Sequence, residues 1–318
     1  MVIRSVSLFT VFTLARPRWN MTIAPITQKH AHHSSLLSLL DLPYLPVGSM
    51  PSFFDLLVGR IQSCDSLLCV GLDPHGKELA KNDAEHAKNF CLRLIDETSH
   101  VACCYKPNAA FFEVFGDAGF VALKAVIDHI PKDIPVLLDC KRGDIGSTAT
   151  AYAVSAYEHL KAHGITLSPY MGRDSIAPFV REDRGVFVVC KSSNPGSGDL
   201  QTLQVVQSEG DTPKPLYLCV ADMCVGLGEN VGLVVGATDT DALEKVRASH
   251  PRVWILAPGV GAQGGDLRGA LEKGLRADGM GMILPVSRGI SQSESPRQAA
   301  EALRAQINEA RKAKTGAA

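Results

Sequence analysis

Short apolar runs, separated by amphipathic stretches of helical period, fill the chain from about residue 50 onward. The runs are apolar throughout and do not alternate with polar residues, which is typical of parallel strands buried on both faces. The predicted strands are Leu67–Leu72, Val101–Tyr105, Val136–Asp139, Ile165–Ser168, Val186–Cys190, Val231–Val235, Val253–Ala257 and Met280–Leu284. Eight strands close a parallel barrel, so the pattern predicts an α/β protein of the (β/α)8 TIM-barrel type. A doubly wound open sheet would give a similar pattern and stays open as an alternative.

The segments between the strands are predicted to be helices, and several begin with Asp, Ser or Thr in the capping position. The clearest are Ala84–Thr98, Gly119–His129, Thr148–Ala162, Asp239–Ser249 and the closing helix Ser295–Lys312. A longer segment, Asp199–Gly228, separates the fifth strand from the sixth.

Residues 1–49 differ in composition from the rest. The stretch from Met1 to Leu40 has no acidic residue, and its apolar part, Val6–Ala15, is too short to span a bilayer. Met50 is followed by Pro-Ser-Phe-Phe-Asp, which is typical of a helix start. We therefore expect a barrel domain over residues 50–318, preceded by an extension that is disordered or carries a targeting signal.

Charge and cysteine content limit the partners and the compartment. The 32 Lys and Arg residues balance 33 Asp and Glu residues to a net charge of −1, so no overall field favours nucleic acid or a membrane surface. Most of the 9 cysteines lie in apolar runs, which predicts reduced, packed thiols and a cytoplasmic protein, or an organellar one if residues 1–49 direct it there. Cys219 and Cys224 lack a second ligand pair, so no metal site is expected.

Charged residues gather where the first three predicted strands end. Asp73 follows the first strand, Lys106 follows the second, and Asp139, Lys141 and Asp144 form a D-x-K-x-x-D motif at the third. The carboxyl ends of barrel strands hold the active site, and crowded opposite charges there usually indicate function. Any one of these residues alone could belong to a surface ion pair, but the five together predict a catalytic cluster.

The last two strands are followed by turns suited to an anion. Gly-rich turns expose backbone N–H groups, and Arg288 adds a guanidinium that can bind a phosphate with two hydrogen bonds. In this barrel class the phosphate site commonly lies after strands seven and eight, although Gly-rich turns alone could be ordinary loops. After the fifth strand, Ser192-Ser193-Asn194-Pro195-Gly196 could read the edge of a planar heterocycle or could be only a turn.

The motif Asp139-Cys140-Lys141-Arg142-Gly143-Asp144-Ile145 closely resembles the D-x-K-x-x-D-I signature of the orotidine 5'-monophosphate decarboxylases. Further blocks resemble those of the family in the same order: Gly71-Leu72-Asp73-Pro74, Tyr105-Lys106-Pro107-Asn108, Ser192-Ser193-Asn194-Pro195-Gly196, Pro258-Gly259-Val260-Gly261-Ala262-Gln263 and Ser287-Arg288-Gly289. The resemblance covers about residues 52 to 310. It is strongest to the branch with a long segment between strands five and six, as in the decarboxylase domain of UMP synthase.

The resemblance implies decarboxylation of orotidine 5'-monophosphate to UMP without metal or organic cofactor. Lys141 would protonate C6 while Asp139 flanks the leaving carboxylate and Lys106 extends the charged chain. Asp144 would complete the catalytic set from across a homodimer interface. The implied substrate contacts are Asp73 and Asn108 at the ribose and the charged network, Ile145 and Thr148 in the partner's site, Ser193 at the pyrimidine, and Gln263 and Arg288 at the phosphate. Pro258 and Gly289 are further implied substrate contacts.

Two rival functions fit parts of the pattern. A sugar-phosphate lyase or synthase of the same suprafamily would need Mg²⁺ and hence a carboxylate after the second strand, where this chain has Lys106. An inactive nucleotide-binding or scaffold protein would lack one of the charged partners, because an unused charge cluster only destabilises the fold.

Overall fold

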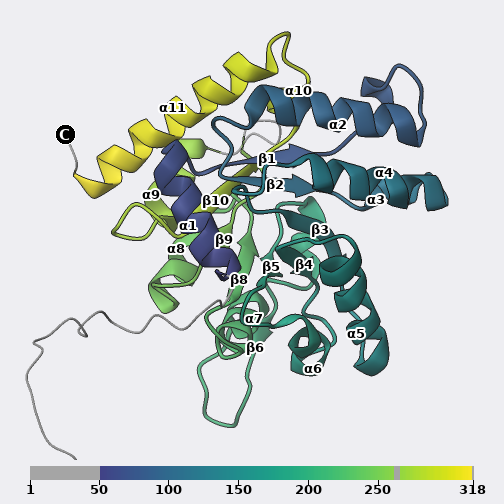
Figure 1. Ribbon diagram of the computed structural model, residues 1–318. Coiled ribbons are helices and arrows are strands. Elements are labelled where there is room, and N and C mark those ends of the chain that lie inside the picture. The colour runs from purple at the N-terminus through teal and green to yellow at the C-terminus, as the bar shows by residue number, and fades with distance from the viewer. Residues whose placement is uncertain (1–50, 261–265, 317–318) are drawn as a thin grey trace, which may run out of the picture. The chain divides into compact units, whose positions relative to one another are not determined.

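Eight parallel strands form a barrel in the computed structural model, which describes residues 51–260 and 266–316 (Figure 1). They are β1 (Leu68–Leu72), β2 (Cys104–Pro107), β3 (Leu137–Arg142), β4 (Gly164–Leu167), β5 (Gly185–Lys191), β8 (Val231–Val235), β9 (Ile255–Leu256) and β10 (Met282–Val286). The hydrogen-bonded order is β2-β1-β10-β9-β8-β5-β4-β3. Two parallel bridges, Tyr105 to Val136 and Asn108 to Asp139, join the outer strands β2 and β3. The barrel prediction is therefore confirmed, and the open-sheet alternative is wrong.

Helices surround the strands (Figure 1). The longer ones are α1 (Phe53–Cys64), α2 (Ala84–Thr98), α4 (Gly116–His129), α5 (Gly146–Val154), α7 (Leu216–Val225), α8 (Thr240–Ser249), α9 (Leu267–Gly274) and α11 (Pro296–Thr315). Short helices are α3 (Ala110–Glu113), α6 (Arg173–Ile176) and α10 (Arg288–Ser291). The capping predictions are confirmed, because the side chains of Asp83, Asp239 and Ser295 accept hydrogen bonds at the starts of α2, α8 and α11. The predicted helix Thr148–Ala162 is observed as α5 followed directly by a π-helical turn over Ser155–His159.

Helix α1 starts where the sequence predicts a helix start. Ser52 and Asp55 form a reciprocal capping box, and Phe53 is the first helical residue. The Phe53 ring lies against the backbone of Gly185 at the start of β5, where an added Cβ atom would approach the ring to 2.5 Å. It also meets the Phe187 ring edge to face, with the ring centroids 5.9 Å apart. Helix α1 therefore packs against the amino ends of the strands, opposite the predicted active site.

Strand β3 runs further than predicted and is irregular where it carries the motif. It continues past Asp139 to Arg142, and its register with β4 shifts between Leu138 and Arg142. Lys141 adopts a positive φ of 46°, which a non-glycine residue rarely does. The Thr166 hydroxyl on β4 accepts the backbone N–H groups of Cys140 and Lys141, each at 3.0 Å. Hydrogen bonds from the β3 backbone to the Thr166 side chain thus replace regular backbone pairing between β3 and β4 at this point.

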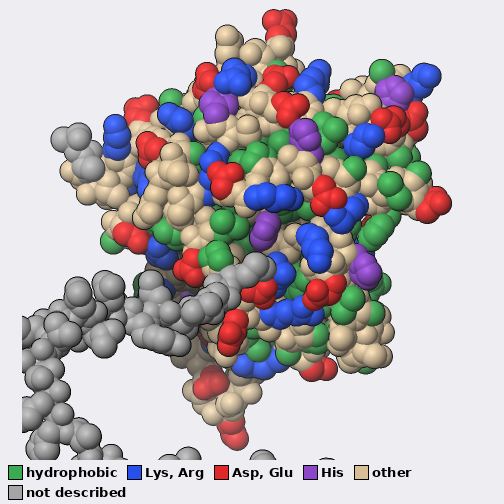
Figure 2. All heavy atoms as spheres, viewed as in Figure 1, with side chains coloured by type: hydrophobic (Ala, Val, Ile, Leu, Met, Phe, Trp, Pro, Cys, Tyr) green, Lys and Arg blue, Asp and Glu red, His purple; other side chains and the backbone are tan. Residues whose placement is uncertain are grey.

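The long segment between β5 and β8 contains its own small structure. Strands β6 (Gln204–Val205) and β7 (Lys214–Pro215) form an antiparallel pair, and α7 follows at once. No helix within residues 51–260 and 266–316 is long and apolar enough to cross a membrane. On the face drawn in Figure 2, Lys and Arg side chains are interspersed with Asp and Glu side chains, as the balanced composition predicts.

Candidate active site

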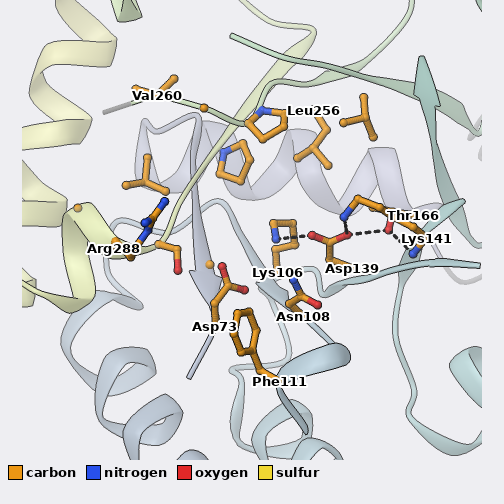
Figure 3. Close-up of a pocket in the computed structure, with 18 of the residues that line it drawn as sticks. Asp73, Lys106, Asn108, Phe111, Asp139, Lys141, Thr166, Leu256, Val260 and Arg288 are labelled. Atoms are coloured by element: carbon orange, nitrogen blue, oxygen red, sulfur yellow. Dashed lines mark hydrogen bonds and ion pairs between the residues drawn. The ribbon is translucent and has the colours of Figure 1, made fainter. Parts of the chain in front are cut away.

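A cavity of about 270 Å³ opens at the carboxyl ends of the strands (Figure 3). Eight of the residues predicted from sequence line it: Asp73, Lys106, Asn108, Asp139, Lys141, Pro258, Arg288 and Gly289. They come from both the charged motifs of β1, β2 and β3 and the turns after β9 and β10. Chain folding therefore brings the two predicted constellations to one cavity.

The Asp139 carboxylate is the centre of a hydrogen-bonded charged cluster, which we define as Lys106, Asp139 and Lys141. Lys106 Nζ lies 2.8 Å from Asp139 Oδ2, and Lys141 Nζ lies 2.7 Å from Asp139 Oδ1. The Thr166 hydroxyl donates to the same Oδ1 at 2.9 Å. Figure 3 shows the carboxylate between the two ammonium groups. Both of its oxygens are thus occupied, and the carboxylate is held in one orientation.

Burial and charge act in opposite directions on this cluster. Burial lowers the pKa of Lys106, but the nearby carboxylates of Asp73 and Asp139 outweigh it and raise that pKa above its usual range. Burial raises the pKa of Asp139, but Lys106 and Lys141 outweigh it and hold that pKa well below its usual range. Both groups are therefore charged at neutral pH, although Lys106 is only 6% and Asp139 only 7% exposed.

Lys141 is positioned by its backbone as well as by Asp139. Its positive φ costs on the order of 1–2 kcal/mol for a residue with a side chain. The two N–H groups bound by Thr166 hold this conformation in place. The side chain of Lys141 is 53% exposed, so the ammonium that reaches Asp139 also faces the open part of the cavity.

The opposite side of the cavity is suited to an anion. Arg288 and Gly289 begin the short helix α10, and the Arg288 side chain lies across the cavity from the charged cluster (Figure 3). Gly259 in the turn after β9 has a φ of 107°, a conformation that favours glycine. A guanidinium beside a tight glycine turn offers the hydrogen-bond donors that a phosphate group needs. Gln263, the remaining predicted phosphate ligand, lies outside the described residues.

Several residues of the cavity were not predicted from sequence. They are Thr166, His75 and Phe111, while Ser287 lies in a recognised block for which no contact of its own was predicted. The His75 and Phe111 rings meet edge to face with centroids 4.4 Å apart and form part of the wall. The Ser287 hydroxyl is buried and has no hydrogen-bond partner among the described residues, as is true of Asp73 Oδ1. A lone Thr in the apolar strand β4, and a His directly after Asp73-Pro74, were the signals that could have found the first two.

Four predicted residues do not line this cavity. Asp144, Ile145 and Thr148 lie beyond β3 or at the start of α5, and Ile145 exposes 56% of its surface. The Asp144 carboxylate accepts the N–H of Ile145 at 2.8 Å. Ser193 follows β5 and lies against Gly236, where an added Cβ atom would come within 2.9 Å of it.

Within the part of the chain that the structure describes, no group of three or more His, Cys, Asp or Glu side chains is arranged to hold a metal ion.

Together the closed barrel and the charged cavity at its carboxyl end define a TIM-barrel enzyme. A profile of the orotidine 5'-phosphate decarboxylase / HUMPS family matches residues 66–303. The chain belongs to this family.

Relatives agree with this assignment. The orotidine 5'-phosphate decarboxylase of Roseiflexus castenholzii is 45% identical over 276 residues, which cover 82% of this chain and 99% of the relative. The solved OMP decarboxylase of Leishmania donovani is 53% identical, with a TM-score of 0.74, over 82% of this chain and 98% of its own. The UMP synthase of Leishmania donovani is also 53% identical, with a TM-score of 0.76, but only 57% of its length is covered. The similarity to that longer protein is therefore confined to part of it.

Proposed function

We propose that this chain converts orotidine 5'-monophosphate to UMP and CO₂ in pyrimidine biosynthesis. The observation that carries the proposal is the charged Lys106–Asp139–Lys141 cluster, in which Lys106 and Asp139 are buried and which faces Arg288 across one cavity of about 270 Å³. A nucleotide placed with its phosphate at Arg288 presents its base to the charged cluster. The relative from Roseiflexus castenholzii and the solved decarboxylase from Leishmania donovani bear the name of this activity.

Lys141 is the group that acts on the reacting carbon. When the bond between C6 and the carboxylate breaks, its electron pair stays on C6, and Lys141 then donates a proton from Nζ to that carbon. Asp139 holds the ammonium at 2.7 Å before the reaction, so no reorientation is needed as charge develops. The departing carboxylate lies beside Asp139, and the neutral amine of Lys141 regains its proton from solvent.

The phosphate end contributes binding and does no chemistry. We assign it to Arg288, Gly289, Pro258 and Gln263, with Asp73 and Asn108 at the ribose. Binding energy from this end holds the base against the charged cluster. The unsatisfied Asp73 Oδ1 supports the ribose assignment, because a sugar hydroxyl would supply the missing hydrogen bond.

No metal or organic cofactor takes part in the proposed reaction. A metal-dependent relative of the same suprafamily would need a carboxylate at the end of β2, and Lys106 occupies that place with a charge that repels cations. Turnover of orotidine 5'-monophosphate, followed by ultraviolet absorbance with and without a chelator, tests both statements. Equal rates with and without chelator are expected, and a chelator-sensitive rate would refute the metal-free mechanism.

The proposed active unit is a homodimer in which Asp144, Ile145 and Thr148 serve the partner's site. Two observations support this role: none of the three residues lines the cavity of its own chain, and Ile145 is exposed. Mixing Lys141→Ala with Asp144→Ala tests the sharing, because one site of a mixed dimer is then intact. About a quarter of wild-type activity is expected for random exchange of equal subunits. Demonstrated exchange without recovered activity would place Asp144 in the site of its own chain.

We place the enzyme in a reducing cytoplasmic compartment. The nine cysteines are free, and all but Cys140 are buried. If residues 1–49 carry an organellar signal, imaging of a fluorescent protein fused to them will show it.

A further inference from the structure

A second buried lysine lies outside the charged cluster. Lys191 is the last residue of β5, is only 5% exposed and does not line the active-site cavity. Its ammonium donates to Ser197 Oγ at 2.8 Å and to the Ser192 carbonyl at 3.4 Å, and it lies 3.2 Å from Asp239 Oδ2. Burying an ammonium is costly unless its donors are satisfied, and here three oxygens match its three N–H groups. The proposed reaction does not use this charge.

The three oxygens belong to separate segments. Ser192 directly follows β5, and Ser197 lies in the 3-10 turn Pro195–Asp199. Asp239 caps helix α8, where its other oxygen accepts the N–H of Ala242 at 3.0 Å. One ammonium therefore ties the loop after β5 to the start of α8.

Further contacts hold the same loop at its ends. The Gln201 side chain accepts the Ser192 N–H at 2.8 Å and donates to Ser192 Oγ at 2.8 Å. On the other side, Gly236 donates its N–H to the Lys191 carbonyl at 2.8 Å, and its lack of a side chain leaves room for Ser193. Gly236 lies two residues beyond Val234, which lines the cavity. The loop that begins at Ser192 is thus fixed against the wall of the active site.

We propose that Lys191 is a positioning residue for the nucleobase. It holds residues 192–199 in the conformation in which Ser193 and neighbouring backbone groups bind the edge of the pyrimidine. A hydrophobic side chain would fill the same space, but it could not bind oxygens from the loop and from Asp239 together. The inference rests on the proposed function, because only a nucleotide substrate would bring a pyrimidine to the end of β5.

Binding of two ligands tests the proposal. UMP carries the base, whereas ribose 5-phosphate carries only the sugar and the phosphate. Lys191→Met is expected to weaken UMP binding about tenfold and to change ribose 5-phosphate binding less than about twofold, measured by calorimetry. With orotidine 5'-monophosphate as substrate, the loss is expected mainly as a raised KM.

Arg247→Met is the control for the loss of another cation that binds backbone carbonyls, here a partly buried one. Arg247 lies near the other end of α8, donates to the carbonyls of Val253 at 2.7 Å and Gly274 at 2.8 Å, and does not line the cavity. It is expected to lower the Tm while leaving the ratio of the two binding constants unchanged. If Lys191→Met leaves that ratio unchanged as well, Lys191 is merely structural and the proposal is overturned.

A milder variant decides the question if Lys191→Met does not fold. Ser197→Ala removes one of the three oxygens and is expected to shift the binding ratio in the same direction by a smaller factor. An unchanged ratio in folded Ser197→Ala would then overturn the proposal. Failure of the proposed function is a separate result, since it appears as absent turnover of orotidine 5'-monophosphate by the wild-type enzyme.

Discussion

Lys106→Met should destabilise the protein strongly, and the loss should depend on pH. The Lys106–Asp139 pair is 2.8 Å long, and its side chains are only 7% and 10% exposed. Removing one partner of a buried pair costs about 3–5 kcal/mol. For a domain of this size that corresponds to a fall in Tm of roughly 6–20 °C.

The sign of the pH dependence follows from Asp139. The pKa of Asp139 in the unfolded chain is 3.8, and in the folded wild type it is lower. The Asp139 carboxylate therefore stabilises the fold at every pH above 3.8, and this stabilisation is lost only as the pH falls below 3.8. In Lys106→Met, burial still acts on Asp139 but one of the two opposing ammonium groups is gone, so the pKa of Asp139 rises. The variant then binds a proton at Asp139 more readily, and its deficit relative to the wild type should be smaller at pH 5 than at pH 8.

Urea denaturation at both pH values measures the deficit. The double variant Lys106→Met/Asp139→Asn should recover more than half of it, because no unpaired carboxylate remains at that position. Lys245→Met is the matched control, since the Lys245–Asp241 pair has a similar length of 2.7 Å but side chains 51% and 70% exposed. Lys245→Met should not shift the midpoint of urea denaturation measurably. An equal deficit at both pH values, with no recovery in the double variant, would refute the reasoning.

Three further changes have defined outcomes. Arg288→Ala should lower kcat/KM by about 10- to 100-fold, mostly through a raised KM, because a charged hydrogen bond to phosphate is lost; normal affinity for UMP would show that the phosphate site is misplaced. His163 accepts the N–H of Val136 at 3.1 Å, and burial, helped by nearby cations, lowers its pKa below 6.5, so wild-type Tm should fall from pH 7 to pH 5 more steeply than that of His163→Gln. Parallel Tm curves would contradict this. A chain that begins at Met50 should fold and match full-length kcat/KM; an insoluble product would show that residues 1–49 are needed.

The sequence predicted the fold class because buried parallel strands and capped helices leave local patterns. All eight strands were located, and α2 was predicted with its observed bounds. The errors lie where contacts between strands override local pattern. The local pattern ends the third strand at Asp139, yet β3 continues to Arg142, because pairing with β4 resumes between Arg142 and Leu167 after a register shift.

The site could be predicted to the extent that its residues carry charge in a spaced motif. Lys106, Asp139 and Lys141 meet as expected, because adjacent barrel strands end at one rim. Thr166 was missed because a hydroxyl in an apolar strand reveals its partners only in three dimensions. Lys191 directly precedes the recognised block Ser192–Gly196, but nothing in the linear order shows that Asp239, almost fifty residues later, lies beside it.

The Lys106–Asp139 pair lies between β2 and β3, where it stabilises the barrel as well as serving the proposed reaction. Strands β1 and β2 pair over four residues, whereas β2 and β3 are joined in the described barrel by the two isolated bridges. The ion pair crosses this thinly bonded junction, so the groups that the proposed reaction needs also hold the wall of the barrel together. Replacing Lys106 in order to redesign this barrel for another reaction would also weaken the contact between β2 and β3. Redesign would therefore have to begin with new contacts between β2 and β3, before the chemistry is changed.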